Sequence, residues 1–138
     1  MSLVSSRVAS AALYTTAVVN LLAGSAALAL PDLNTSILYG LEVPLEGVAL
    51  RYHYMIWSTV VAMGVGYMVA ARAPERYSAL ILAAALGKLS IAGIWLEMAW
   101  HGIGTWILLA GTVFDGSLGL FLLVFFSRTE SRCTKWKG

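Results

Sequence analysis

Long apolar stretches alternate with shorter polar segments along the whole chain. Crossing a bilayer core about 30 Å thick takes about 20 residues of helix, and four stretches are long enough: residues 8–30, 53–71, 77–100 and 105–126. None of them contains a proline, because Pro31, Pro44 and Pro74 all lie between the stretches, where helix breakers are expected. The pattern predicts a single all-α domain, an integral membrane bundle of four antiparallel transmembrane helices.

Composition strengthens the membrane assignment. Of the 138 residues, 59% are hydrophobic and 12% are charged, and the mean hydropathy is +0.80, whereas about 25% of the residues of a soluble domain are charged. These values exclude a disordered chain and an ordinary soluble enzyme, and a single cysteine excludes a disulfide scaffold. The formal net charge of +2 is too small to indicate a nucleic-acid partner.

The first stretch also has features of a signal peptide. Arg7 precedes an apolar run, and Ala27-Leu28-Ala29 at its end has the small residues of a cleavage site. The run is, however, longer than the apolar region of a signal peptide, which has about 7–15 residues. We therefore expect residues 8–30 to remain in the protein as a helix.

Basic residues alternate between the two sides of the predicted bundle. Arg7 precedes the first span, Arg72 and Arg76 lie in the turn between the second and third spans, and four basic residues follow the fourth span: Arg128, Arg132, Lys135 and Lys137. The other connections carry Asp32, Glu42, Glu46 and a single arginine, Arg51. The positive-inside rule places both termini and the turn at 72–76 in the cytoplasm. This orientation suits a bacterial cytoplasmic membrane.

Residues 31–52 form the longest segment between spans, which we interpret as an outer loop. The segment begins with turn-forming residues, among which Asp32 and Asn34 are candidate caps, and then becomes apolar. We expect it to lie on the outer surface or to cap the bundle, and a lid over a site is the alternative.

Three polar residues lie near the middle of the predicted spans: Asn20, Lys88 and Asp115. Ionisable groups at this depth are costly and are functional candidates. Neighbouring antiparallel helices would bring Lys88 and Asp115 to one depth as a pair, to which Asn20 could hydrogen-bond. Gly111 and Gly119 share the helix face of Asp115, so another helix can approach closely. We favour a structural pair that locks the helices together, and a proton relay, ion site or substrate counter-ion is the alternative.

A second group of polar residues is predicted at the outer end. Glu97 and His101 are four residues apart and share a helix face, and His53 begins the second span at a similar level. Two histidines and one carboxylate are the ligand set of catalytic zinc and of non-haem iron sites. Tryptophan and tyrosine residues nearby form an aromatic belt, where histidine also occurs. We therefore favour interface anchoring over metal binding for these residues.

One face of the third span is predicted to point away from the bundle. Lys88 and Glu97 are nine residues apart, which places them on opposite faces of a helix. If Lys88 faces the interior, a stripe of Ser90, Gly93 and Glu97 faces outward. This stripe predicts a homo-oligomer or a place in a larger membrane complex.

Several segments within residues 53–126 also follow a known pattern: Gly66-Tyr67-Met68-Val69-Ala70-Ala71-Arg72 running into Pro74, then Gly87-Lys88, then Asp115 ahead of Leu120-Phe121-Leu122. In these segments the chain resembles the DoxX-like families of small bacterial four-helix membrane proteins. Members of that group have been linked to quinone-associated oxidoreductase complexes as small subunits. The resemblance implies an accessory membrane subunit, identifies no reaction and assigns no functional residue.

These observations predict a non-catalytic integral membrane subunit that binds a partner protein, a lipid or a lipophilic molecule such as a quinone. The first alternative is a small proton- or ion-coupled carrier, in which Lys88 and Asp115 titrate during transport. The second alternative is a membrane enzyme acting on a lipophilic substrate, with His53, Glu97 and His101 as acid–base groups or metal ligands.

Overall fold

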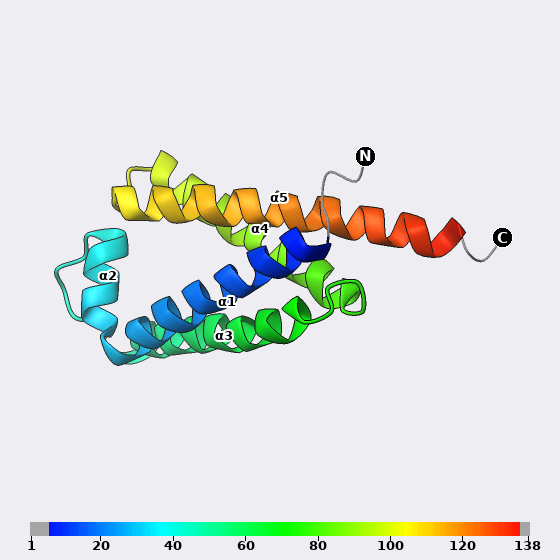
Figure 1. The fold of residues 1–138 in the computed structure, drawn as a ribbon. Coiled ribbons are helices and arrows are strands. Elements are labelled where there is room, and N and C mark those ends of the chain that lie inside the picture. The colour runs from blue at the N-terminus through cyan, green and yellow to red at the C-terminus, as the bar shows by residue number, and fades with distance from the viewer. Residues whose placement is uncertain (1–5, 136–138) are drawn as a thin grey trace.

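The computed structural model describes the backbone of residues 6–135 and the side chains of residues 6–129. Within this range the chain forms five helices and no strand (Figure 1): α1 Ser6–Ala29, α2 Pro31–Tyr39, α3 Gly47–Ala71, α4 Ser78–Trp100 and α5 Trp106–Lys135. All except α2 have a segment long and apolar enough to cross a membrane. The predicted all-α fold with four long apolar helices is therefore confirmed. The side chains of Arg132, Cys133, Lys135 and Lys137 lie outside the described residues.

The four long helices form two closely packed pairs, α1 with α3 and α4 with α5, and contacts between the pairs are few (Figure 1). Within the first pair, the Ser10 hydroxyl near the start of α1 donates a hydrogen bond of 2.6 Å to the carbonyl of Ala71 at the end of α3. Near the other end, His53 Nε2 lies 3.0 Å from the carbonyl oxygen of Ala27. Each pair thus consists of two long helices that follow one another in the chain.

Glycines allow the helices of each pair to approach closely. A Cβ at Gly24 of α1 would lie 2.7 Å from Val61 Cγ2 of α3. A Cβ at Gly119 of α5 would lie 2.8 Å from Leu89 Cγ and 3.1 Å from the carbonyl oxygen of Ala85, both on α4. Such small residues are typical of helix contacts in membranes, where close van der Waals packing drives association.

A helix occupies much of the segment that we interpreted as a loop at residues 31–52. Pro31 is at the start of α2, where its missing N–H costs nothing, and Gly40 ends α2 in a left-handed conformation with φ of 69°. The prediction of Asp32 or Asn34 as a cap is wrong, because Leu30 is the N-cap residue and no side chain caps the helix. Asp32 instead accepts a hydrogen bond of 3.0 Å from the Leu45 N–H.

Helix α2 connects the two pairs at one end of the bundle, which we call the α2 end. Thr105, just before α5, donates from its backbone N–H to the Leu38 carbonyl at 2.9 Å and from its hydroxyl to the Ile37 carbonyl at 2.6 Å. Tyr39 reaches α4, where it is hydrogen-bonded to Trp95; burial raises the pKa of Tyr39 and this hydrogen bond partly offsets the rise. The short helix therefore braces the ends of α4 and α5 against the first pair.

Two apolar clusters lie at different levels of the bundle. The larger joins all four long helices toward the end opposite α2, and its largest fully buried members are Leu13, Ile81 and Leu122. The smaller lies at the α2 end and contains Ala27, Leu38 and Trp57. Along α1, Asn20 falls between Ala17 of the first cluster and Ala27 of the second. The middle of the bundle is therefore the level at which polar side chains meet.

Candidate functional site

The structure brings Asn20, Lys88 and Asp115 together in the middle of the bundle, as a cluster that we call the polar centre. Lys88 Nζ donates to Asp115 Oδ1 at 2.6 Å and to Asn20 Oδ1 at 3.3 Å. The exposed fractions of Lys88, Asp115 and Asn20 are only 7%, 6% and 5%. Three helices, α4, α5 and α1, thus contribute to one enclosed polar contact that includes both pairs.

The local sequence explains why these side chains meet. The absence of a side chain at Gly119 lets the backbone of α5 approach the Ala85 carbonyl of α4, so the short carboxylate of Asp115 can reach Lys88. On α1, Gly24 lies one turn after Asn20 and packs against the backbone of α3 at Trp57. Small residues beside each polar residue therefore set the helix spacing that the polar contact requires.

Because Lys88 and Asp115 are buried, the free-energy cost of placing them in the bundle depends on their pairing. An isolated lysine or aspartate at the bilayer centre costs about 2.5–3.5 kcal/mol on insertion scales. The short Lys88–Asp115 contact offsets much of that cost, since each charge is attracted by the other in surroundings of low dielectric constant. Loss of either partner would therefore leave the other group buried without its partner.

Tyr67 is a polar residue of this region that sequence reasoning missed. It lies on α3, is 3% exposed, and belongs to the larger apolar cluster. With Tyr67, each of the four long helices has a buried residue that carries a polar group. A tyrosine inside an apolar span, here one turn before the end of α3, is a usable signal, because its hydroxyl needs a polar neighbour when it is buried.

The residues predicted at the outer end do not form one group. Glu97 Oε1 and His101 Nε2 are 3.3 Å apart, and both side chains are more than half exposed. His53 is buried on α3 beside the Ala27 carbonyl, with its ring near those of Tyr54 and Trp57. Among residues 6–129, no three histidine, cysteine, aspartate or glutamate side chains are placed to share a metal ion. His53 therefore does not join Glu97 and His101 as a third ligand.

The stripe on α4 that was predicted to face outward is exposed. Ser90, Gly93 and Glu97 are all at the surface, while Lys88 on the same helix is buried. A Cβ at Gly93 would have no other atom within 4 Å. This side of α4 is thus open to lipid or to another protein.

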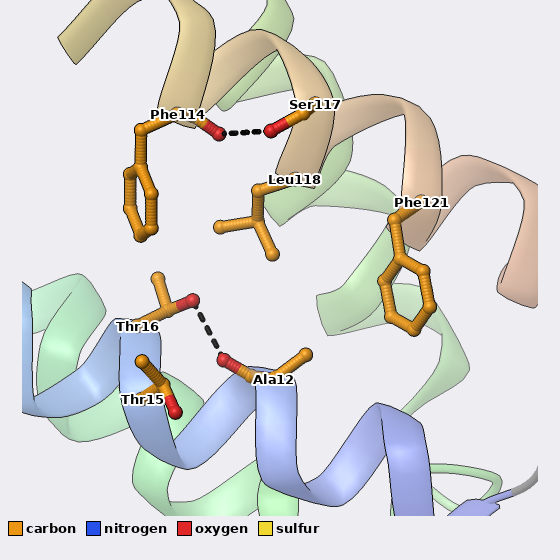
Figure 2. A pocket seen from close by; sticks show the side chains of 7 residues that line it. All are labelled: Ala12, Thr15, Thr16, Phe114, Ser117, Leu118 and Phe121. Atoms are coloured by element: carbon orange, nitrogen blue, oxygen red, sulfur yellow. Dashed lines mark hydrogen bonds between the residues drawn. The ribbon is translucent and has the colours of Figure 1, made fainter. Parts of the chain in front are cut away.

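A groove of about 280 Å³ lies between α1 and α5, and we call it the α1–α5 groove. Figure 2 shows Phe114, Leu118 and Phe121 extending from α5 toward α1. The full lining is Ala12, Thr15, Thr16, Phe114, Ser117, Leu118 and Phe121. Two of its hydroxyls bond to the backbone of their own helices, Thr16 to Ala12 at 2.7 Å and Ser117 to Phe114 at 3.0 Å. The groove therefore presents a mainly apolar and aromatic surface.

The α1–α5 groove lies beside the polar centre. Thr16 is one helical turn before Asn20 on α1, and Phe114 directly precedes Asp115 on α5. The sequence does not predict the groove, although Phe114, Ser117 and Phe121 are spaced three and four residues apart and so share one side of a helix. Its existence depends on the separation of α1 and α5, which belong to different pairs.

Two features of this chain thus have the form of a site: a buried charge pair held by an asparagine, and an apolar groove next to it. The resemblance of residues 53–126 to the DoxX-like families stays a prediction. The function is argued from the geometry, because no protein-family model, no curated protein and no solved structure matches the chain.

Proposed function

We propose that this protein is a non-catalytic integral membrane subunit that binds a lipophilic molecule in the α1–α5 groove. The observation that carries the proposal is the lining of this groove, in which two phenylalanine rings and a leucine face α1 and two hydroxyls are bonded to their own backbone. Such a surface offers dispersion and aromatic contacts and few free hydrogen-bonding groups. A ligand that suits it is flat or chain-like and apolar, such as a quinone ring or an acyl chain.

The size of the groove limits what it can hold. Sites for drug-sized ligands have volumes of about 300–1,000 Å³, and this groove has about 280 Å³. It therefore accommodates one ring or a short length of chain, with the rest of the ligand in the surrounding lipid. A quinone or lipid already dissolved in the bilayer would reach it from the side.

The proposed membrane topology is four antiparallel spans with both termini in the cytoplasm. The contacts of Ser10 with Ala71 and of His53 with Ala27 support opposite directions for α1 and α3. The start of α1, the end of α3 and the start of α4 all lie at the end of the bundle opposite α2. Three arginines, Arg7, Arg72 and Arg76, lie there, which supports a cytoplasmic position for this end. A bacterial cytoplasmic membrane is the proposed location, with the exposed side of α4 available to a second copy or a partner subunit.

Filling the groove is expected to displace the bound molecule. Ser117→Trp would place a large ring between α1 and α5, whereas Val113→Trp would add the same ring at a position of α5 that is 71% exposed and outside the lining. We expect native mass spectrometry in mild detergent to show a lipophilic mass on the unmodified protein and on Val113→Trp, and none on Ser117→Trp. A mass that persists on Ser117→Trp would contradict this assignment of the groove.

A proton- or ion-coupled carrier is the second candidate function, favoured by the charge pair at mid-bundle beside a groove. In a carrier, Lys88 and Asp115 would titrate during transport. In proteoliposomes, Lys88→Met combined with Asp115→Leu should abolish proton or ion flux if the protein is a carrier. If it is a subunit, the same double variant should keep the lipophilic molecule. Flux that depends on the pair would replace the first proposal with the second.

A further inference from the structure

A second groove, of about 420 Å³, lies at the end of the bundle opposite α2, where α1 begins and α3 ends. Its lining comes from both helices and the turn that follows: Ser6, Arg7, Ser10, Ala11, Tyr14, Ala71, Arg72 and Pro74. We call it the arginine groove. The proposed function makes no use of it, and it shares no lining residue with the α1–α5 groove.

The charges around the arginine groove are unbalanced. Arg7 of α1 and Arg72 at the end of α3 both line it and are exposed, and no carboxylate lines it. The nearby carboxylate of Glu75 accepts a hydrogen bond of 2.5 Å from the Ser6 hydroxyl. Among the side chains of residues 6–129, neither arginine forms an ion pair with a carboxylate. Two arginines from different parts of the chain thus line one groove.

The lining of the arginine groove changes from charged to apolar along α1, from Arg7 toward Tyr14. Arg7 is in the first turn of α1, Ala11 is one turn further along, and Tyr14 is about 10 Å from Arg7 at 1.5 Å per residue. Both Ala11 and Tyr14 are exposed within the apolar span. The groove therefore has a cationic end at the level of the lipid headgroups and an apolar end at the level of the acyl chains.

We propose that the arginine groove binds an anionic phospholipid. Arg7 and Arg72 would hold the phosphate, because the planar guanidinium donates paired hydrogen bonds that match phosphate oxygens. The surface of Ala11 and Tyr14 would hold the first part of an acyl chain. Basic clusters at membrane-protein ends attract anionic lipids in this way, and here two helices and an apolar continuation give the cluster the shape of a lipid.

The test measures binding of phosphatidylglycerol and of zwitterionic phosphatidylcholine to the full chain by native mass spectrometry in detergent. We expect phosphatidylglycerol to bind more tightly than phosphatidylcholine. The double variant Arg7→Gln with Arg72→Gln should weaken phosphatidylglycerol binding about 25-fold, because the loss of each arginine lowers the affinity about five-fold. Arg76→Gln is the matched control, since Arg76 is in the same turn but does not line the groove. This control should change binding less than two-fold. An equal loss in the control and in the double variant would overturn the proposal.

Two further measurements separate a lipid site from a simple anion site. Ala11→Trp fills the apolar part without changing the charge and should also reduce phosphatidylglycerol binding, at unchanged helical content by circular dichroism. Undiminished binding to Ala11→Trp would overturn the lipid assignment. Inorganic phosphate in millimolar excess should not displace the lipid, and displacement would show that the arginines bind free phosphate instead.

Discussion

Asp115→Leu is expected to destabilise the bundle by about 3–5 kcal/mol, the usual cost of breaking a buried ion pair by removing one partner. Lys88 is only 7% exposed, and the substitution leaves its ammonium group with the Asn20 carbonyl at 3.3 Å as its one side-chain partner among the described residues. One neutral oxygen cannot replace the carboxylate at 2.6 Å. The loss would be measured as the change in unfolding free energy of the purified protein in mixed micelles with increasing fractions of dodecyl sulfate.

Removing both charges gives the control for this prediction. Lys88→Met with Asp115→Leu should recover most of the lost stability, because apolar residues of similar volume often replace a buried pair at little cost. Glu97→Leu removes a carboxylate from the exposed contact with His101 and should change stability by less than about 1 kcal/mol. A double variant as unstable as Asp115→Leu would show that the destabilisation does not arise from an unpaired lysine.

Gly119→Ala is expected to destabilise the α4–α5 pair by about 1–3 kcal/mol, the usual range for an overpacked contact. The new Cβ would lie 2.8 Å from Leu89 Cγ and 3.1 Å from the Ala85 carbonyl oxygen. The carbonyl belongs to helix backbone and cannot rotate away, so α5 must move outward. The same micelle titration measures the effect, and the movement would also lengthen the contact between Lys88 and Asp115.

Gly116→Ala is the matched control on the same helix. Its Cβ would lie 3.6 Å from Ala92 Cβ, which is ordinary van der Waals contact. Both variants gain the higher helix propensity of alanine, by up to about 1 kcal/mol, so the difference between them isolates the cost of the close approach. Equal stability of the two variants would mean that the helices are not held at the spacing described.

The long helices could be predicted from the sequence because the bilayer sets their length. Residues 8–30 and 77–100 match α1 and α4 to within two residues at each end. Helix α3 begins at Gly47, six residues before the predicted start of the second span at residue 53, because hydropathy indicates the apolar part of a helix and not its polar ends. Helix α2 was missed because Pro31 was interpreted as a breaker, although proline is also common at the first position of a helix.

The polar centre could be predicted in outline because few residues in the apolar spans have a charged side chain. Depth alone brings Lys88 and Asp115 to one level. Rotation of a helix about its axis is harder to predict. His53 is predicted at the start of the second span, but its burial against the Ala27 carbonyl depends on which face of α3 meets α1. The α1–α5 groove depends on the distance between two helices that belong to different pairs. No local pattern in the sequence indicates that distance.

The division into two pairs also bears on how this protein is made. Lys88 and Asp115 belong to α4 and α5, which are consecutive in the chain and pack along each other. The second pair can therefore enter the bilayer as one unit during synthesis, with its two opposite charges already neutralised. The first pair brings an uncharged amide, Asn20, to the same contact. Neither unit has to carry a lone charge across the membrane before the other arrives.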